Sequence, residues 1–230
     1  MRRSDAGVIQ EHSERVETTE YKPEKSFPRS SMVNVNASGK LVALACSTGG
    51  PKALQQVIPK LPENLDAAVV LVQHMPVGFT ASLSARLDEM SEIRVREAQD
   101  GEVLQKGTVY IAKGGSQMRV IEKNRHEFVL SVREEGARNG LKPCADILYE
   151  SLRESSFEDI TCVIMTGMGA DGTKGILQLK ETNKIYVIAQ NAESSTVYGM
   201  PKAIAESGAV DEIKDLDLIA DAIIKHVGVR

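Results

Sequence analysis

The segment from residue 41 to residue 52 constrains the fold more than any other part of the sequence. It opens with the apolar run LVALAC, which is typical of a strand buried on both faces of a sheet. Ser47 follows on a glycine-rich turn, and Pro51 then begins a stretch with helical spacing of apolar residues. Ligands of open α/β sheets bind at such strand ends, where free N–H groups favour negative oxygens. We therefore expect Ser47 to act either as a nucleophile or in a phosphate-binding turn.

Composition and charge exclude several classes of protein. The 230 residues suit one sizeable domain, and 42% apolar with 26% charged residues is ordinary for a soluble globular chain. A net charge of −4 gives no reason to expect nucleic acid or an anionic membrane as a partner. No apolar run approaches the ~20 residues of a membrane span, and no signal-peptide core follows the N-terminus. We expect a cytoplasmic protein without membrane insertion, and a monomer as the default.

The three cysteines, Cys46, Cys144 and Cys162, do not have the spacing of metal ligands. Cys46 and Cys162 lie in apolar strands, where a free cysteine behaves as a small hydrophobic residue. An odd number of such thiols is typical of a reducing compartment. We predict no metal site and no bound cofactor.

The chain divides into a polar N-terminal segment and a folded domain. Residues 1–38 carry mixed charge, prolines and serines with no hydrophobic period, which indicates a flexible linker or tail. Residues 39–230 alternate buried strands with amphipathic helices, which predicts a doubly wound α/β domain with a mostly parallel sheet and helices on both faces. The expected strands are 41–46, 67–74, 160–165, 185–189 and 209–212, and the expected helices begin near 51 and 176 or span 79–90, 143–152, 200–207 and 216–227.

The middle of the domain has a different pattern. Four short segments alternate apolar and polar residues, and the dipeptides between them are typical of tight turns. This predicts an antiparallel hairpin region, inserted in the parallel sheet or at its edge. The four segments are 93–98, 107–112, 118–121 and 127–132.

Three polar residues follow buried strands in glycine-rich surroundings: Ser47, His74 and Asp171. The carboxyl ends of parallel strands lie on one edge of a sheet, so these residues can converge. A serine hydroxyl needs a histidine to accept its proton, and the histidine needs an acceptor on its other ring nitrogen. Of the four histidines, only His74 ends a buried strand. The three residues are thus candidates for a catalytic triad.

Each candidate also has a purely structural alternative. Ser47 precedes a helix and could be its N-cap, Asp171 could be a turn or capping residue, and His74 could cap a helix or turn. The order Ser, His, Asp and the sequence around Ser47 differ from those of α/β-hydrolases. The glycines at 167, 169 and 172 have dinucleotide-binding spacing but lie far from the first strand–helix unit. A non-catalytic α/β module that binds a nucleotide or a receptor is therefore the competing hypothesis.

Several motifs together resemble the catalytic domain of chemotaxis protein-glutamate methylesterases, the CheB family. The resemblance covers about residues 39–227 and includes motifs in the family's order. The motifs are STGG at 47–50, QHMP at 73–76, GFT at 78–80, TGMGADG at 166–172, AQN at 189–191 and GMP at 199–201.

The resemblance implies a role for each candidate site residue. Ser47 would be the nucleophile, His74 its base and Asp171 the partner that orients the histidine. The positions of Thr48 and Met168 match family positions near the nucleophile, which implies that their backbone N–H groups form the oxyanion site. The implied substrates are γ-glutamyl methyl esters, and some glutamines, on the cytoplasmic helices of methyl-accepting chemoreceptors.

Two features depart from the family pattern. Members usually carry an N-terminal receiver domain, and residues 1–38 are too few and too polar to form one. We expect this segment to be either the interdomain linker of a longer protein or the tail of a stand-alone enzyme. The family also commonly has an arginine where this sequence has Lys142, which keeps the charge but lacks the planar fork of a guanidinium group.

Overall fold

A computed structural model describes residues 39–124 and 127–230. The tail predicted for residues 1–38 lies outside the described residues. Within them a single seven-stranded sheet is formed, in the order β3-β4-β2-β1-β7-β8-β9, and every neighbouring pair is parallel. The strands are β1 (Lys40–Cys46), β2 (Ala68–Gln73), β3 (Arg94–Glu97), β4 (Thr108–Ile111), β7 (Asp159–Ile164), β8 (Ile185–Gln190) and β9 (Glu212–Lys214).

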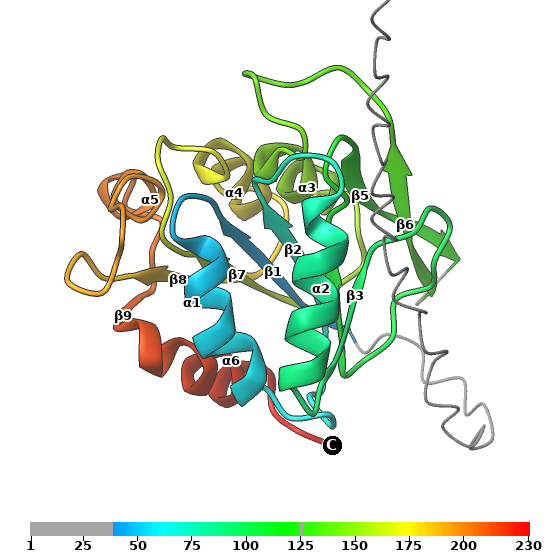
Figure 1. The fold of residues 1–230 in the computed structure, drawn as a ribbon, viewed down its shortest axis with the longest axis horizontal. Helices are drawn as coiled ribbons and strands as arrows, with labels where there is room; N and C mark the ends of the chain where they lie inside the picture. The colour runs from blue at the N-terminus through cyan, green and yellow to red at the C-terminus, as the bar shows by residue number, and fades with distance from the viewer. Residues whose placement is uncertain (1–38, 125–126) are drawn as a thin grey trace, which may run out of the picture. The chain divides into compact units, whose positions relative to one another are not determined.

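Helices cover both faces of this sheet (Figure 1). One face packs against α1 (Gly50–Val57), α2 (Phe79–Met90) and α6 (Ile219–Val227). The other packs against α3 (Ala145–Ser151), α4 (Thr173–Lys180) and α5 (Met200–Glu206), and against an antiparallel hairpin of β5 (Gln117–Asn124) and β6 (Glu127–Arg133). Short 3₁₀ turns, η1 (Ile58–Lys60) and η2 (Leu216–Leu218), complete the described elements.

The central strand explains the two-layer covering. Alternate side chains of β1 enter opposite cores: Leu44 packs with the α1 and α2 side, and Ala43 with the α3 and α4 side. Both faces of β1 are fully buried, which accounts for its continuous apolar sequence. The predicted doubly wound α/β fold, with a parallel sheet and an antiparallel hairpin, is confirmed.

The sheet has a topological switch point between β1 and β7. From β1 the chain passes to β2, then to the edge strand β3 and back to β4 between them, whereas from β7 it passes to the other side through β8 to β9. The loops that follow β1 and β7 therefore diverge toward opposite faces of the sheet. Ligands of open α/β sheets bind in the crevice that forms at such a point.

The prediction for residues 93–98 and 107–112 was wrong in one respect. These segments form β3 and β4, which pair in parallel within the main sheet and form no hairpin. The connection between them runs along β6, where Gly101 N–H donates to Leu130 O at 2.8 Å and Leu104 N–H to Phe128 O at 2.9 Å. The alternation in β3 arises because it is an edge strand with Arg94 exposed on one face.

Two boundaries in the C-terminal part also differ from the prediction. The last strand begins at Glu212, whereas 209–212 was expected, and the helix predicted over 216–227 begins with the 3₁₀ turn η2. Asp211 explains the first difference, because its N–H donates to Val187 O and its carboxylate accepts from Val187 N–H. Among the described residues, no helix has both the length and the apolar character needed to cross a membrane.

Tyr149 links helix α3 to the switch point. Its side chain is fully buried, and its hydroxyl lies 3.1 Å from Ala43 O of β1 and 3.2 Å from Val163 O of β7. Tyr149→Phe removes a buried hydroxyl whose single proton these two carbonyls share, and we expect unfolding by urea to show a loss of about 1 kcal/mol. The matched change Tyr186→Phe, at a less buried ring, should cost about 0.5 kcal/mol or less. Equal losses in both variants would contradict this role of Tyr149.

Candidate active site

Ser47 lies directly after β1, at the switch point. Its backbone is held on three sides: its N–H donates to Thr166 O at 2.9 Å, and its carbonyl accepts from Gly50 N–H at 2.8 Å and from Gln73 Nε2 at 3.0 Å. Within the described part of the chain its hydroxyl makes no hydrogen bond. The main chain is therefore fixed, whereas the Oγ atom is available for chemistry.

His74 reaches the same place from β2. The register pairs Cys46 with Gln73, so Ser47 and His74 leave neighbouring strands at the same level. The His74 ring extends toward the loop after β7, where its Nε2 lies 2.7 Å from Oδ2 of Asp171. Both side chains are largely buried, with 10% and 6% exposure. This contact leaves Nδ1 as the ring nitrogen that is available to accept a proton.

The Asp171 carboxylate accepts hydrogen bonds from four donors. Besides His74, Oδ2 accepts from Ala145 N–H at 2.6 Å, and Oδ1 accepts from Asp146 N–H at 3.0 Å and from Cys144 Sγ at 3.1 Å. Burial raises the pKa of Asp171, but the hydrogen bonds from His74 and the two backbone groups outweigh it, so the net pKa lies below its ordinary value. The carboxylate is therefore ionised at neutral pH and suited to hold an imidazole in one orientation.

Neither Ser47 nor Asp171 caps the helix that follows it, although the Asp171 carboxylate does accept the first two N–H groups of α3, those of Ala145 and Asp146. Helix α1 has Gly49 as its N-cap and no side-chain capping bond, so the Ser47 hydroxyl does not cap it. Helix α4 likewise has Gly172 as its N-cap without a side-chain bond. Both glycines have φ near +90°, at 83° and 95°, a conformation that other residues rarely adopt. Glycine thus occupies each N-cap position, and neither the Ser47 hydroxyl nor the Asp171 carboxylate is used to cap the helix that follows it.

Thr48 and Met168 lie on the loops that follow β1 and β7. Both are exposed, and the Met168 side chain is 76% exposed. Within the described residues neither backbone N–H donates a hydrogen bond, although the Thr48 carbonyl accepts one from Thr166 Oγ1 at 2.9 Å. Free N–H groups at the ends of β1 and β7 have the chemistry required to bind an oxyanion.

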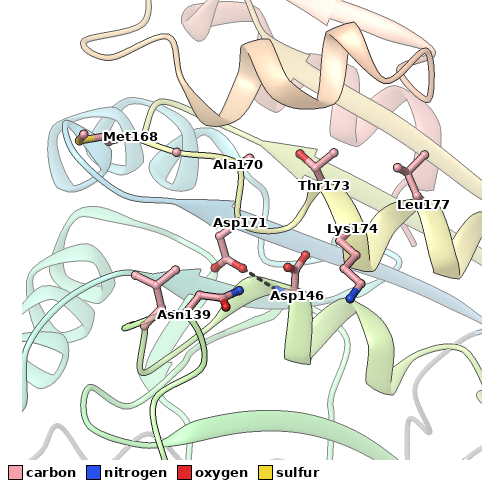
Figure 2. Close-up of a pocket in the computed structure, with 10 residues that line it drawn as sticks. Asn139, Asp146, Met168, Ala170, Asp171, Thr173, Lys174 and Leu177 are labelled. Carbon is pink, nitrogen blue, oxygen red and sulfur yellow. Dashed lines mark hydrogen bonds between the residues drawn. The ribbon is translucent and has the colours of Figure 1, made fainter.

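A cleft of about 530 Å³ opens beside Asp171. Figure 2 shows Asp146 and Asp171 side by side, with Met168 and Leu177 toward opposite ends of the group of lining residues. The remaining lining is mixed: Leu141, Gly169 and Ala170 are apolar, Asn139 and Thr173 are polar, and Lys174 of α4 contributes a positive charge. The cleft is thus an elongated surface next to the polar residues, suited to a substrate larger than the reacting group.

Two buried amides that the sequence analysis overlooked fasten the loops of the site. Gln73, which is 2% exposed, joins the ends of β1 and β2 through the Ser47 and His74 carbonyls, both at 3.0 Å. Gln190 ends β8 and accepts the Thr166 N–H at 2.8 Å. Each is the polar last residue of an otherwise apolar strand, and that position in the sequence would have identified them.

Lys142 is half-buried on the segment that leads into α3. Its carbonyl accepts a hydrogen bond from Gly115 N–H at 3.2 Å. Within the described residues its ammonium group forms no ion pair, which leaves the charge free for a ligand.

The fold and this cluster define an α/β protein with a histidine–aspartate pair beside a free serine at the switch point. Residues 42–223 match the family model described as CheB methylesterase. The chain covers all of the crystallised catalytic domain of the CheB methylesterase from Thermotoga maritima, at 40% identity over 83% of this chain, with a TM-score of 0.79. The chain therefore belongs to the CheB methylesterase family.

Two curated relatives are similar to this chain over only part of their own length. It is 47% identical over 200 residues to the protein-glutamate methylesterase/protein-glutamine glutaminase of Bacillus licheniformis, and 49% identical over 190 residues to that of Geobacillus kaustophilus. The alignments cover 86% and 82% of this chain but only 55% and 54% of the relatives. The chain thus spans about half the length of these curated relatives.

The low pKa of Asp171 predicts how acid affects stability. Because the folded pKa lies below the unfolded value of about 3.9, ionised Asp171 stabilises the fold above about pH 4, and this contribution is lost as the pH falls through the folded pKa. The free energy of unfolding of the Asp171→Asn variant should therefore fall less steeply on acidification than that of the wild type. Denaturant titrations at a series of pH values measure this, with exposed Asp217→Asn as the control. Equal steepness in Asp171→Asn and wild type would contradict the assignment.

Proposed function

We propose that this domain hydrolyses γ-methyl esters of glutamate side chains on the cytoplasmic helices of chemoreceptors, as part of chemotaxis adaptation. The observation that supports it most is the His74–Asp171 contact of 2.7 Å beside the free hydroxyl of Ser47, in a chain of the CheB family. The relatives are named as protein-glutamate methylesterases and protein-glutamine glutaminases, so receptor glutamines are proposed as second substrates.

In the proposed mechanism the reaction proceeds through an acyl-enzyme. Ser47 Oγ bonds to the ester carbonyl carbon while Nδ1 of His74 takes the hydroxyl proton. The His74 imidazolium then gives that proton to the departing methoxy group, which leaves as methanol. A water molecule, deprotonated by His74, attacks the acyl carbon, and the bond to Oγ breaks with return of the proton to Ser47. The free glutamate carboxylate is released.

The remaining residues are assigned to support the charges that develop. Asp171 stabilises the His74 imidazolium and fixes the tautomer that leaves Nδ1 as the acceptor. The backbone N–H groups of Thr48 and Met168 bind the tetrahedral oxyanion, where one such donor contributes about 3 kcal/mol. The Ser47 hydroxyl closes on His74 when substrate binds, since catalytic hydrogen bonds are often long in free enzymes. The cleft beside Asp171 holds the segment of the substrate helix that flanks the ester.

The proposal extends to partners and location. Because the relatives are nearly twice as long as the aligned region, we assign this domain to a cytoplasmic protein with an N-terminal receiver domain. The receiver would control access of the receptor helix to the edge of the sheet that carries Ser47.

Replacing Ser47 tests the nucleophile. Methanol release from methylated receptor fragments should fall by about 10⁴–10⁶-fold in kcat for Ser47→Ala, the scale found for triad nucleophiles. Ser207→Ala, on the exposed end of α5, should retain wild-type turnover. Near-normal turnover of Ser47→Ala would remove the assignment. Absence of labelling of wild-type Ser47 by a serine-reactive phosphonate would favour the non-catalytic binding module.

Glutamine-bearing receptor fragments test whether one site performs both reactions. With a glutamine substrate the leaving group is ammonia, and the same acyl-serine should form. We expect Ser47→Ala and His74→Ala both to abolish ammonia release along with methanol release. Ammonia release that survives in Ser47→Ala would show that deamidation uses other residues.

A further inference from the structure

Among the described residues, the Cys144 thiol is the one side-chain donor to Asp171 that the proposed triad does not use. Its Sγ lies 3.1 Å from Oδ1, and Cys144 is only 1% exposed. Burial, together with the negative charge of Asp171, raises the pKa of this thiol to about 12. The sulfur therefore keeps its proton at neutral pH and acts as a hydrogen-bond donor to the carboxylate.

Hydrogen bonds to the main chain around Cys144 fix the position of this thiol. Its backbone N–H donates to Oε1 of Gln117, a fully buried side chain of β5, at 2.9 Å. The Nε2 of Gln117 donates in turn to Leu141 O at 3.1 Å, so Gln117 holds the segment 141–144 before α3 at both of its ends. The hairpin thus fixes the main chain from which the thiol reaches the edge of the sheet.

Comparison with the other cysteines shows that the position is specific. Cys46 donates to the neutral Gln73 Oε1 at 3.1 Å. Cys162 is fully buried in β7, and within the described residues it makes no hydrogen bond. Of the three thiols, only that of Cys144 contacts an ionised group among residues 39–124 and 127–230.

The two carboxylate oxygens of Asp171 accept hydrogen bonds from different donors. Oδ2 faces His74 and Ala145 N–H, whereas Oδ1 faces Asp146 N–H and Cys144. Rotation of the carboxylate about its Cβ–Cγ bond would break the hydrogen bonds of both oxygens. We propose that Cys144 is a positioning residue, whose thiol donates to Oδ1 and holds the carboxylate in the plane in which Oδ2 meets His74. This inference rests on the proposed roles of His74 and Asp171 in ester hydrolysis.

Three variants test it, each measured for methanol release from methylated receptor fragments. Cys144→Ala should lower kcat about tenfold, the size expected for loss of one hydrogen bond to a charged group, with KM changed less than twofold. Cys144→Ser keeps a donor and should recover most of the wild-type kcat. Cys162→Ala removes an equally buried thiol that touches no site residue, and should leave kcat unchanged.

A spectroscopic measurement distinguishes a positioning role of Cys144 from a general role in core packing. The proton between His74 Nε2 and Asp171 should give a low-field NMR resonance, whose position would report that hydrogen bond. We expect it to move or broaden in Cys144→Ala, to return in Cys144→Ser, and to stay in place in Cys162→Ala. Wild-type kcat together with an unmoved resonance in Cys144→Ala would overturn the proposal, as would failure of the serine variant to recover activity.

A further measurement applies even if Cys144→Ala does not fold. The infrared S–H band of Cys144, assigned by its loss in Cys144→Ser, should lie below that of Cys162, because hydrogen bonding lowers the stretching frequency. Equal frequencies would overturn the proposal. Failure of the proposed ester hydrolysis at Ser47 would be recognised separately, because methanol release would then survive in Ser47→Ala.

Discussion

The structure depends on the pairing of β1 with β2 on one side and with β7 on the other. This arrangement sends the loop after β1 and the loop after β7 toward opposite faces of the sheet. It also brings Ser47, His74 and Asp171 to one edge, although the first and the last are 124 positions apart in the sequence. The pairing is stabilised by burial on both faces, since every residue of β1 after Lys40 is buried. The geometry of the edge therefore follows from the packing of the sheet.

Buried polar side chains supply hydrogen bonds to loop backbone groups that the sheet does not pair. The loops after β1, β2 and β7 carry backbone groups that have no strand partner, and these need hydrogen bonds once they are out of water. Gln73 satisfies two such carbonyls, Gln190 satisfies the Thr166 N–H, and the Thr166 hydroxyl links the Thr48 carbonyl to the segment at Val197. This network holds the loops, and within the part of the chain that the structure describes the Ser47 hydroxyl and the N–H groups of Thr48 and Met168 make no hydrogen bond.

Several parts of the fold could be predicted because their sequences carry strong local patterns. The expected helix 79–90 coincides with α2, and the run before Ser47 is β1, since periodicity and burial agree there. The pairing of β3 with β4 could not be read from the sequence, because an edge strand exposes one face and alternates as a hairpin strand does. The convergence of His74 and Asp171 was predictable from their strand-end positions. The contacts of Cys144 and Gln117 were not, because they depend on how the hairpin packs against α3.

The two carboxylates beside the cleft show how neighbouring groups of one type acquire different properties. Asp146 is 5% exposed, and burial, together with the charge of Asp171, raises its pKa. Asp171 has the opposite shift, because its hydrogen bonds outweigh burial. Their hydrogen bonds also differ: Asp146 Oδ1 accepts from Gly172 N–H at 3.0 Å and Gly175 N–H at 2.8 Å, and so holds the start of α4.

Asp146 therefore acts on the loop that carries its neighbour. Gly172 is the residue after Asp171, so the bond to its N–H fixes the main chain from which the Asp171 carboxylate projects. The Asp146 N–H, in turn, donates to Asp171 at 3.0 Å. Each aspartate thus orients the other through backbone groups, and only Asp171 contacts the histidine. Environments that separate the ionisation of adjacent carboxylates in this way are a recurring means of assigning one of them to a reaction.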